Sequence, residues 1–149
     1  MEKILSSSSQ DYLEAILELS TENSGVRVTD IANKLNIKKA SVTQAINILS
    51  EEGLVLRERY GPVYLTSKGL EEAERVKIKH YLLKYFFENI LGVNKDTAEN
   101  DACLIEHALS EETFIYFAEY LNKSGHLEEF SKKNKLKEIY AEKIKTLKI

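Results

Sequence analysis

Three side chains that commonly bind transition metals occur close together in one stretch of the sequence. Cys103, Glu106 and His107 have the spacing that places a thiol, a carboxylate and an imidazole on one face of a helix. This mixture suits a first-row divalent transition ion better than Ca²⁺ or Mg²⁺. The opposite side of the predicted helix carries Leu104 and other apolar residues and can pack inward. Because one helix face supplies too few ligands to complete a site, further ligands must come from other elements.

Other candidate ligands are weak when each is taken alone. His80 lies in the middle of the longest predicted helix, and a single helical histidine is usually a surface or boundary residue. Asp11 and Glu14 lie three residues apart in an amphipathic helix near the N-terminus, where an isolated acidic pair is usually solvated. Their role therefore depends on whether the fold brings them to the same place as Cys103.

The composition indicates a globular, mostly helical protein with an uneven charge distribution. The chain has 149 residues, 43% of them hydrophobic, with 1 Pro and 6 Gly against 30% charged residues. Residues 38–79 carry eight basic against six acidic residues, residues 88–129 carry ten acidic against two basic, and residues 130–149 hold seven lysines against two glutamates. A weakly basic section before a strongly acidic one fits a DNA-binding module joined to a cation-binding module.

The cysteine count and the apolar runs indicate the compartment. A single cysteine excludes an internal disulfide, which fits a reducing cytoplasm. The first residues lack the apolar core of a signal peptide, and no apolar run is long enough to span a bilayer. We therefore expect a cytoplasmic protein with no membrane partner.

A helix-turn-helix pattern occupies the segment before residue 54. A short helix over residues 29–35 is followed by a tight connection, and Gly53 closes a second helix over residues 40–49. The apolar positions predicted to interlock between them are Ile31, Ala32, Leu35, Ile37, Val42, Ile46 and Leu49.

Cations, hydroxyls and an amide gather at the start of the second helix of this pattern. Such groups contact DNA phosphates and base edges when a helix enters the major groove. The predicted DNA contacts here are Lys38, Lys39, Ser41, Thr43 and Gln44.

A hairpin is predicted directly after the second helix. Residues 54–59 and 63–66 have the pattern of two short strands around a Tyr-Gly-Pro turn. After a helix-turn-helix such a hairpin forms a wing, from which Arg57 and Arg59 can reach the sugar-phosphate backbone. The alternative is an ordinary surface hairpin with solvated charges.

The remainder of the chain is predicted to be helical. A helix from about residue 67 to residue 91 is apolar on more than one side, so it needs more than one partner surface. Helices over residues 96–109 and 111–121 follow, and a lysine-rich helix reaches residue 149. The excess of apolar surface between residues 81 and 121 indicates a homodimer interface, with a self-contained helical core as the alternative.

Together these features resemble the diphtheria toxin repressor family of metal-dependent regulators. The resemblance covers residues from about 10 to 122. It rests on the Asp-Tyr-Leu-Glu segment, the winged helix-turn-helix, the Lys-His-Tyr-Leu-Leu segment and the Cys-x-x-Glu-His-x-Leu-Ser signature. The metal ligands implied by the resemblance are Asp11, Glu14, His80, Cys103, Glu106 and His107.

The resemblance implies a fold, a partner and a mechanism. The expected fold is mainly α, with a winged helix-turn-helix over residues 1–70 and an all-helical metal-binding and dimerisation domain over residues 71–149. The expected function is that of a homodimeric repressor, not an enzyme, which binds a palindromic operator in double-stranded DNA when metal is present. Its expected targets are metal-ion homeostasis genes.

Departures from the family pattern bear on the metal. The manganese-responsive branch has Glu at the position of Cys103, and the iron-responsive branch has Met in place of Asp11. This chain mixes the two, so Mn²⁺ and Fe²⁺ both remain candidates for the co-repressor. Lys84 and Glu99 replace residues of an ancillary site in iron-responsive members, which argues against that site here. The length resembles the short form without a C-terminal barrel domain.

Two other functions remain open at this point. The first is a redox-sensing winged-helix transcriptional regulator in which Cys103 is the switch and the acidic residues are structural. The second is a metal- or thiol-dependent hydrolase that pairs Cys103 with His107. The hydrolase lacks a third orienting group and an oxyanion-stabilising loop, which makes it the weaker alternative.

Overall fold

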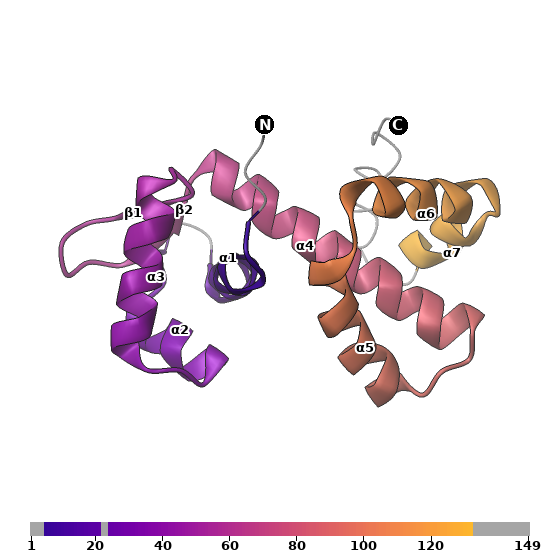
Figure 1. Cartoon of the computed structure of the whole chain (residues 1–149), viewed down its shortest axis with the longest axis horizontal. Coiled ribbons are helices and arrows are strands. Elements are labelled where there is room, and N and C mark those ends of the chain that lie inside the picture. Colours follow the sequence, from indigo (N-terminus) through magenta and orange to yellow (C-terminus); the bar gives the residue numbers. More distant parts are fainter. Residues whose placement is uncertain (1–4, 22–23, 133–149) are drawn as a thin grey trace. The chain divides into compact units, whose positions relative to one another are not determined.

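The computed structural model describes residues 5–21 and 24–132 (Figure 1). The chain divides into two compact units, an N-terminal unit over Met1–Lys77 and a C-terminal unit over Ile78–Ile149. The boundary lies inside helix α4 (Ser67–Tyr85), which contributes residues to both units. The described residues are mainly helical with one two-stranded sheet, and the predicted fold class is confirmed.

The N-terminal unit begins with three helices, α1 (Ser7–Leu19), α2 (Val28–Leu35) and α3 (Lys39–Glu51). Between α2 and α3 the chain turns through Asn36, whose φ of 53° lies in the left-handed region that Asn tolerates. The tight connection predicted for a helix-turn-helix is therefore present.

The core of the N-terminal unit forms between these helices and the hairpin that follows them. Leu13 and Ile16 of α1 are fully buried against apolar residues of α2 and α3. Most of the predicted interlocking residues are buried or half-buried, but Ile37 is 38% exposed. Ile37 follows the left-handed turn, so its side chain leaves the inner face of α2.

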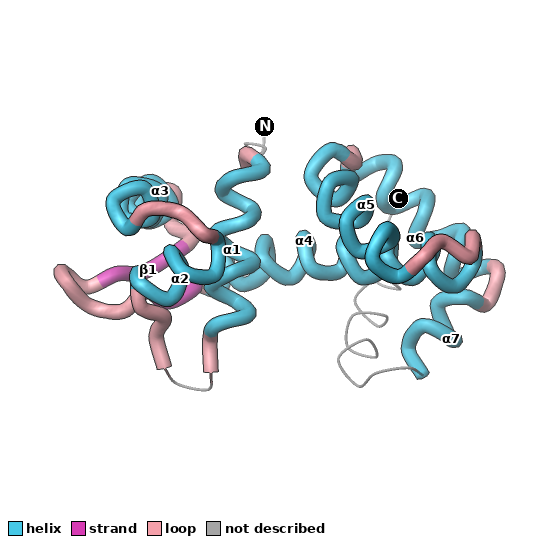
Figure 2. The backbone as a smooth tube through the Cα atoms, turned by 90° about the horizontal axis from the view of Figure 1, so that it is seen from below, coloured by secondary structure: helices cyan, strands magenta, loops and turns pink. Residues whose placement is uncertain are grey.

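The hairpin forms as predicted, with shorter strands. Strands β1 (Val55–Arg57) and β2 (Val63–Leu65) are antiparallel, with Leu56 opposite Tyr64. Figure 2 shows the strands in magenta, with the loop that joins them in pink. A bridge between Val26 and Val63 attaches the hairpin to the segment before α2. The wing is thus anchored to the helical core of its own unit.

Helix α4 starts against the end of α3. The Thr66 hydroxyl accepts a hydrogen bond from the Gly69 N–H at 3.0 Å and donates to the Gly53 carbonyl at 2.7 Å. A Cβ at Gly69 would lie 1.9 Å from the Leu54 carbonyl oxygen, so only glycine fits there. The α-helix predicted to continue to residue 91 ends at Tyr85 and is followed by a π-helix, η1 (Phe86–Ile90).

The C-terminal unit contains the end of α4, η1 and three further helices, α5 (Lys95–Ala108), α6 (Glu111–Lys123) and α7 (His126–Lys132). Asn94 and Ser110 cap α5 and α6 by accepting hydrogen bonds from the first backbone N–H groups. The core of this unit comprises Ile78, Leu82, Tyr85, Phe114, Ala118, Leu121, Leu127 and Phe130. The predicted lysine-rich helix beyond residue 132 lies outside the described residues.

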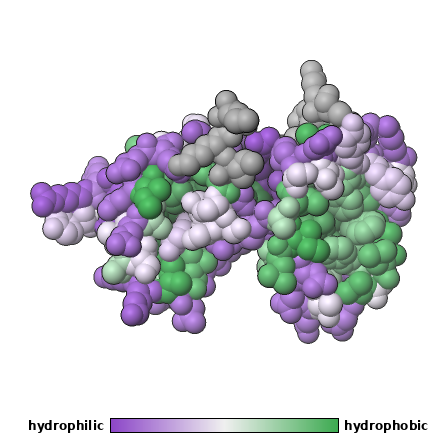
Figure 3. Space-filling view, in the orientation of Figure 1, coloured by the Kyte–Doolittle hydropathy of each residue, from purple (hydrophilic) through white to green (hydrophobic). Residues whose placement is uncertain are grey.

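Apolar side chains also reach the surface of the C-terminal unit (Figure 3). Leu91 is 59% exposed and Leu104 is 74% exposed, and the aromatic rings of Tyr116 and Tyr120 are also largely exposed. None of the helices in the described ranges combines the length and apolar character that crossing a membrane requires.

Candidate functional site

One face of α5 is buried in the C-terminal unit, and it carries the Glu106 carboxylate. The buried residues of α5 are Ala98, Ala102 and Glu106, spaced four apart along one face. The expectation that Leu104 packs inward is wrong, because residues two apart on a helix differ by about 200° in direction and Leu104 therefore faces away from Ala102. Small alanines on the buried face leave room for the Glu106 carboxylate, which is only 3% exposed.

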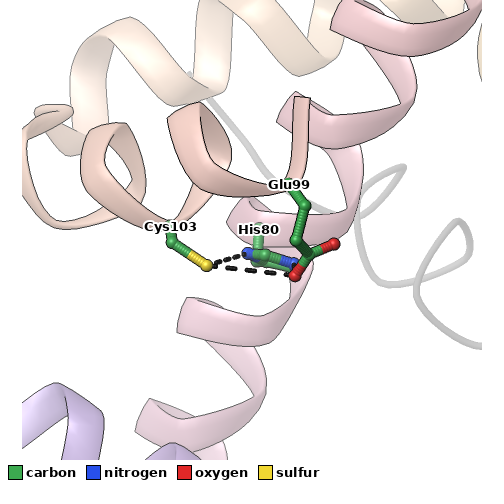
Figure 4. Close-up of side chains that lie close together, drawn as sticks. All are labelled: His80, Glu99 and Cys103. Atoms are coloured by element: carbon green, nitrogen blue, oxygen red, sulfur yellow. Dashed lines mark hydrogen bonds and ion pairs between the residues drawn. The ribbon is translucent and has the colours of Figure 1, made fainter. Parts of the chain in front are cut away.

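His80 on α4 meets Glu106 in the interior of this unit. His80 is 7% exposed, and its Nδ1 lies 2.8 Å from Oε2 of Glu106. The same nitrogen lies 3.7 Å from Sγ of Cys103 (Figure 4). The helical histidine that looked unremarkable alone therefore belongs with the Cys-x-x-Glu-His segment.

His107 lies on the other side of the same carboxylate. Its Nε2 is 3.3 Å from Oε1 of Glu106, while Oε2 of Glu106 faces His80. One buried carboxylate thus lies between two imidazoles. Burying a carboxylate is costly unless it is hydrogen-bonded, paired or bound to a metal. The contacts with His80 and His107 therefore offset the cost of burying the Glu106 carboxylate.

Glu99 joins the cluster although the sequence analysis did not assign it as a ligand. Its Oε1 lies 3.0 Å from Nε2 of His80 and 3.9 Å from Sγ of Cys103. Its Oε2 lies 2.6 Å from Nζ of Lys84. The signal that could have found Glu99 is its position four residues before Cys103, on the same helix face.

Lys84 and Glu99 form an ionised pair. Burial alone would raise the pKa of Glu99, but the hydrogen bond from Lys84 and the proximity of His80 outweigh it, so the pKa lies below its usual value. The hydrogen bond to Glu99 raises the pKa of Lys84, against the opposing effect of burial. Both shifts favour the charged forms.

The donor set fits a divalent transition metal. His80, Glu99 and Cys103 each offer a ligand atom, and these atoms lie within 4.8 Å of one another. Nδ1 of His80 also lies 2.8 Å from Oε2 of Glu106 and 3.7 Å from Sγ of Cys103. These separations match those between ligand atoms that are each bound at about 2.0–2.3 Å to one ion. Nitrogen, thiolate and carboxylate ligands together favour a borderline transition ion over Ca²⁺.

Two of the six predicted ligands belong to the N-terminal unit. Asp11 is exposed and Glu14 half-buried, both on α1. The C-terminal unit brings His80, Cys103, Glu106 and His107 together, whereas ligation by Asp11 and Glu14 stays a prediction.

The outer face of α3 carries most of the predicted DNA contacts. Lys38, Lys39, Ser41 and Gln44 are exposed, whereas Thr43 is half-buried. Asn47 lies one turn after Gln44 and is also exposed, so it extends the same polar face. Asn47 was not among the predicted contacts, although its spacing of three from Gln44 is visible in the sequence.

The wing presents one arginine more fully than the other. Arg59 is exposed, and its guanidinium lies over the Tyr60 ring at 5.5 Å from the ring centre. Tyr60 is 88% exposed at the tip of the hairpin, whereas Arg57 is half-buried within β1. Arg59 is therefore better placed for a phosphate contact than Arg57.

Comparison with known families accounts for both units. Residues 4–63 match the family described as "Iron dependent repressor, N-terminal DNA binding domain". Residues 66–129 match the family described as "Iron dependent repressor, metal binding and dimerisation domain". The two matches cover most of the chain, and they describe a transcriptional regulator, not an enzyme, as predicted.

Individual relatives agree with this assignment. An uncharacterised HTH-type transcriptional regulator from Methanocaldococcus jannaschii is 41% identical over 109 residues, covering 72% of this chain and 87% of the relative. A hypothetical protein from Sulfolobus solfataricus superimposes with a TM-score of 0.65 at 27% identity, covering 80% of this chain and 91% of that protein.

A manganese-dependent transcriptional repressor, solved in complex with manganese, superimposes with a TM-score of 0.66 at 30% identity. The superposition covers 76% of this chain but 52% of that protein, so the chain spans about half the length of this neighbour. The chain therefore belongs to the iron-dependent repressor (diphtheria toxin repressor) family, and it is a metal-dependent, DNA-binding transcriptional repressor whose winged helix-turn-helix precedes a metal-binding and dimerisation domain.

Proposed function

We propose that this protein is a cytoplasmic repressor that uses Mn²⁺ or Fe²⁺ as co-repressor and controls metal-ion homeostasis genes. It acts as a homodimer on a palindromic operator, with a DNA-binding domain over residues 1–70 and a metal-binding and dimerisation domain over residues 71–149. The observation that carries the proposal is the buried Glu106 carboxylate between the imidazoles of His80 and His107, with the Cys103 thiol beside it.

Residues of the C-terminal unit supply four of the proposed ligands. His80, Cys103, Glu106 and His107 approach one another through α4 and α5. A bound divalent cation supplies positive charge and directional bonds, which stabilise the folded arrangement of its ligands. Asp11 and Glu14 complete the proposed set, and what supports their role is the resemblance of the Asp-Tyr-Leu-Glu segment to the family.

The choice between Mn²⁺ and Fe²⁺ depends on the balance of hard and soft ligands. The Cys103 thiolate favours softer ions, while the Glu106 carboxylate and those of α1 favour harder ones. The family description names iron and one structural neighbour is a manganese-dependent repressor, so the ligand types leave both metals in the proposal.

DNA binding is proposed for α3 and the wing. Gln44 and Asn47 carry amides that can form paired hydrogen bonds with adenine in the major groove. Lys38, Lys39 and Arg59 carry the charge that neutralises phosphates. Ser41, Thr43 and Arg57 complete the predicted contact set.

The homodimer is proposed to form through the apolar surface of the C-terminal unit. Leu104, Tyr116 and Tyr120 expose apolar or aromatic area on α5 and α6. Large exposed apolar residues of this kind are typical of interfaces between subunits. The family description of this region as a dimerisation domain supports the same choice.

One experiment tests metal dependence and DNA binding together. The protein is loaded anaerobically with Mn²⁺ or Fe²⁺, its metal content is measured by elemental analysis, and bound sequences are selected from a randomised duplex library with metal or with chelator. We expect bound metal and a palindromic consensus only in the metal-loaded arm. The same consensus and affinity in chelator would contradict the proposal.

A further inference from the structure

The two nitrogens of the His80 ring have different neighbours. Nδ1 lies 2.8 Å from Oε2 of Glu106 and 3.7 Å from Sγ of Cys103. Nε2 lies 3.0 Å from Oε1 of Glu99. In Figure 4 the imidazole lies between the Cys103 sulfur and the Glu99 carboxylate. One edge of the ring therefore faces two metal-binding groups, and the other edge faces a single carboxylate.

Glu99 is itself held from the opposite direction. Its second oxygen lies 2.6 Å from Nζ of Lys84, while its first oxygen faces His80. The Lys84 side chain is 24% exposed and the Glu99 side chain 43% exposed. His80 and Lys84 both lie on α4, one helical turn apart, and Glu99 lies in the first half of α5. The Lys84 ammonium and the His80 ring therefore contact the Glu99 carboxylate from two positions on one helix.

We propose that Glu99 and Lys84 are positioning residues that orient His80 toward the metal, and that Glu99 is not itself a ligand. The inference rests on the metal site of the proposed function. The Nε2–H of His80 donates to Glu99, which leaves the Nδ1 lone pair directed toward Cys103 and Glu106. A carboxylate that accepts from the far nitrogen of a histidine fixes the orientation of the ring and increases its basicity as a ligand.

The competing arrangement makes Glu99 a ligand together with Cys103 and His80, whose ligand atoms lie within 4.8 Å of one another. Two contacts argue against it. An ion bound at Nδ1 lies on the side of the ring that faces Cys103 and Glu106, whereas Glu99 faces Nε2. The other oxygen of Glu99 is already paired with Lys84 at 2.6 Å. Glu106, in contrast, is 3% exposed, and its Oε2 lies 2.8 Å from Nδ1 of His80, closer than the 3.0 Å between Glu99 and Nε2.

The test uses Co²⁺ as the metal probe, added anaerobically to the full chain. The variants are Glu99→Ala, Glu99→Gln and Lys84→Met. The matched controls are Glu119→Ala and Lys123→Met, because Glu119 and Lys123 form a Lys–Glu pair of the same 2.6 Å length on α6. Each titration records the number of Co²⁺ ions per chain, the Kd, and the thiolate-to-cobalt absorption band that reports Cys103 as a ligand. Far-UV circular dichroism checks folding.

We expect every variant to bind the same number of Co²⁺ ions as the wild-type chain and to keep the thiolate band. Glu99→Ala weakens Co²⁺ binding by about 10- to 100-fold, the range for loss of a ligand's hydrogen-bond partner. Glu99→Gln weakens Co²⁺ binding less than Glu99→Ala does, because the amide oxygen still accepts a hydrogen bond from the Nε2–H of His80. Lys84→Met raises the Kd for Co²⁺, in the same direction as Glu99→Ala. The two control variants bind Co²⁺ like the wild-type chain.

Two results would overturn the inference while leaving the proposed function in place. Loss of one Co²⁺ equivalent in both Glu99 variants would make Glu99 a ligand, and wild-type affinity in all three variants would remove the positioning role. Failure of the wild-type chain to bind Co²⁺ would instead contradict the metal site itself. If Glu99→Ala does not fold, Glu99→Gln, which preserves the side-chain shape, provides the comparison.

Discussion

His80 and Glu106, which are 26 residues apart in the sequence, approach each other to 2.8 Å in the interior of the C-terminal unit. Both side chains are almost completely buried. The contact joins α4 to α5, so any ion that binds these two groups also holds the two helices together.

Replacing Glu106 should remove the response to metal. Glu106→Ala deletes the buried carboxylate between the two imidazoles. We expect the Kd for Mn²⁺ to rise by more than about 100-fold, because losing a direct ligand costs more than losing a ligand's hydrogen-bond partner. Metal-stimulated binding to the selected operator, measured by fluorescence anisotropy, should disappear. Glu119→Ala is the control, and stimulation that persists in Glu106→Ala would contradict the ligand assignment.

Replacing Cys103 should change metal preference. In Cys103→Glu a hard carboxylate takes the place of the soft thiolate, so the ratio of Cd²⁺ affinity to Mn²⁺ affinity should fall. Competition titrations with the two ions measure this ratio. An unchanged ratio would mean that Cys103 does not bind the ion. Alkylation of Cys103 in the presence of chelator should leave operator binding unaltered, whereas a redox switch would respond to it.

Asn47 should contribute to base recognition. Asn47→Ala removes an exposed amide from the outer face of α3, so stability should not change. We expect one base-pair position of the selected consensus to lose about 1–3 kcal/mol of discrimination. Lys39→Ala should instead weaken binding to all sequences and reduce the salt dependence. An identical consensus from wild type and Asn47→Ala would exclude a base contact.

Gly69→Ala should destabilise the N-terminal unit. Alanine normally stabilises a helix relative to glycine by about 1 kcal/mol. Here the added Cβ would lie 1.9 Å from the carbonyl oxygen of Leu54, the residue before β1. The backbone of α4 at residue 69 and the backbone at Leu54 must therefore move apart. We expect a loss of about 1–3 kcal/mol in urea unfolding. Glu71→Ala, an exposed position on the same helix, is the control, and a stabilised Gly69→Ala would disprove the close approach.

Leu104→Glu should weaken self-association. Leu104 is 74% exposed, so a charge there costs the isolated unit little but would be buried in the proposed interface. Sedimentation velocity should show a shift from dimer toward monomer, with Lys95→Glu, also exposed on α5, as the comparison. A dimer of unchanged affinity would place the interface elsewhere.

Local patterns in the sequence determined the elements and the kinds of chemistry available. Helical periodicity, the turn before α3 and the Tyr-Gly-Pro turn specified a winged helix-turn-helix, which the structure confirms. These features depend on neighbours within a few residues, so they can be predicted without the fold. The spacing of Cys103, Glu106 and His107 specified a shared helix face for the same reason.

Tertiary packing decided which groups meet. Helical spacing predicted Leu104 to be inside, whereas the fold buries Glu106 on the other face of α5 and brings His80 to it. The fold also places Glu99 between His80 and Lys84, a relationship between two helices that no local pattern contains. Which face of a helix is buried depends on the surface that another element offers to it. That surface is set by residues distant in the sequence, and it exists only once the chain has folded.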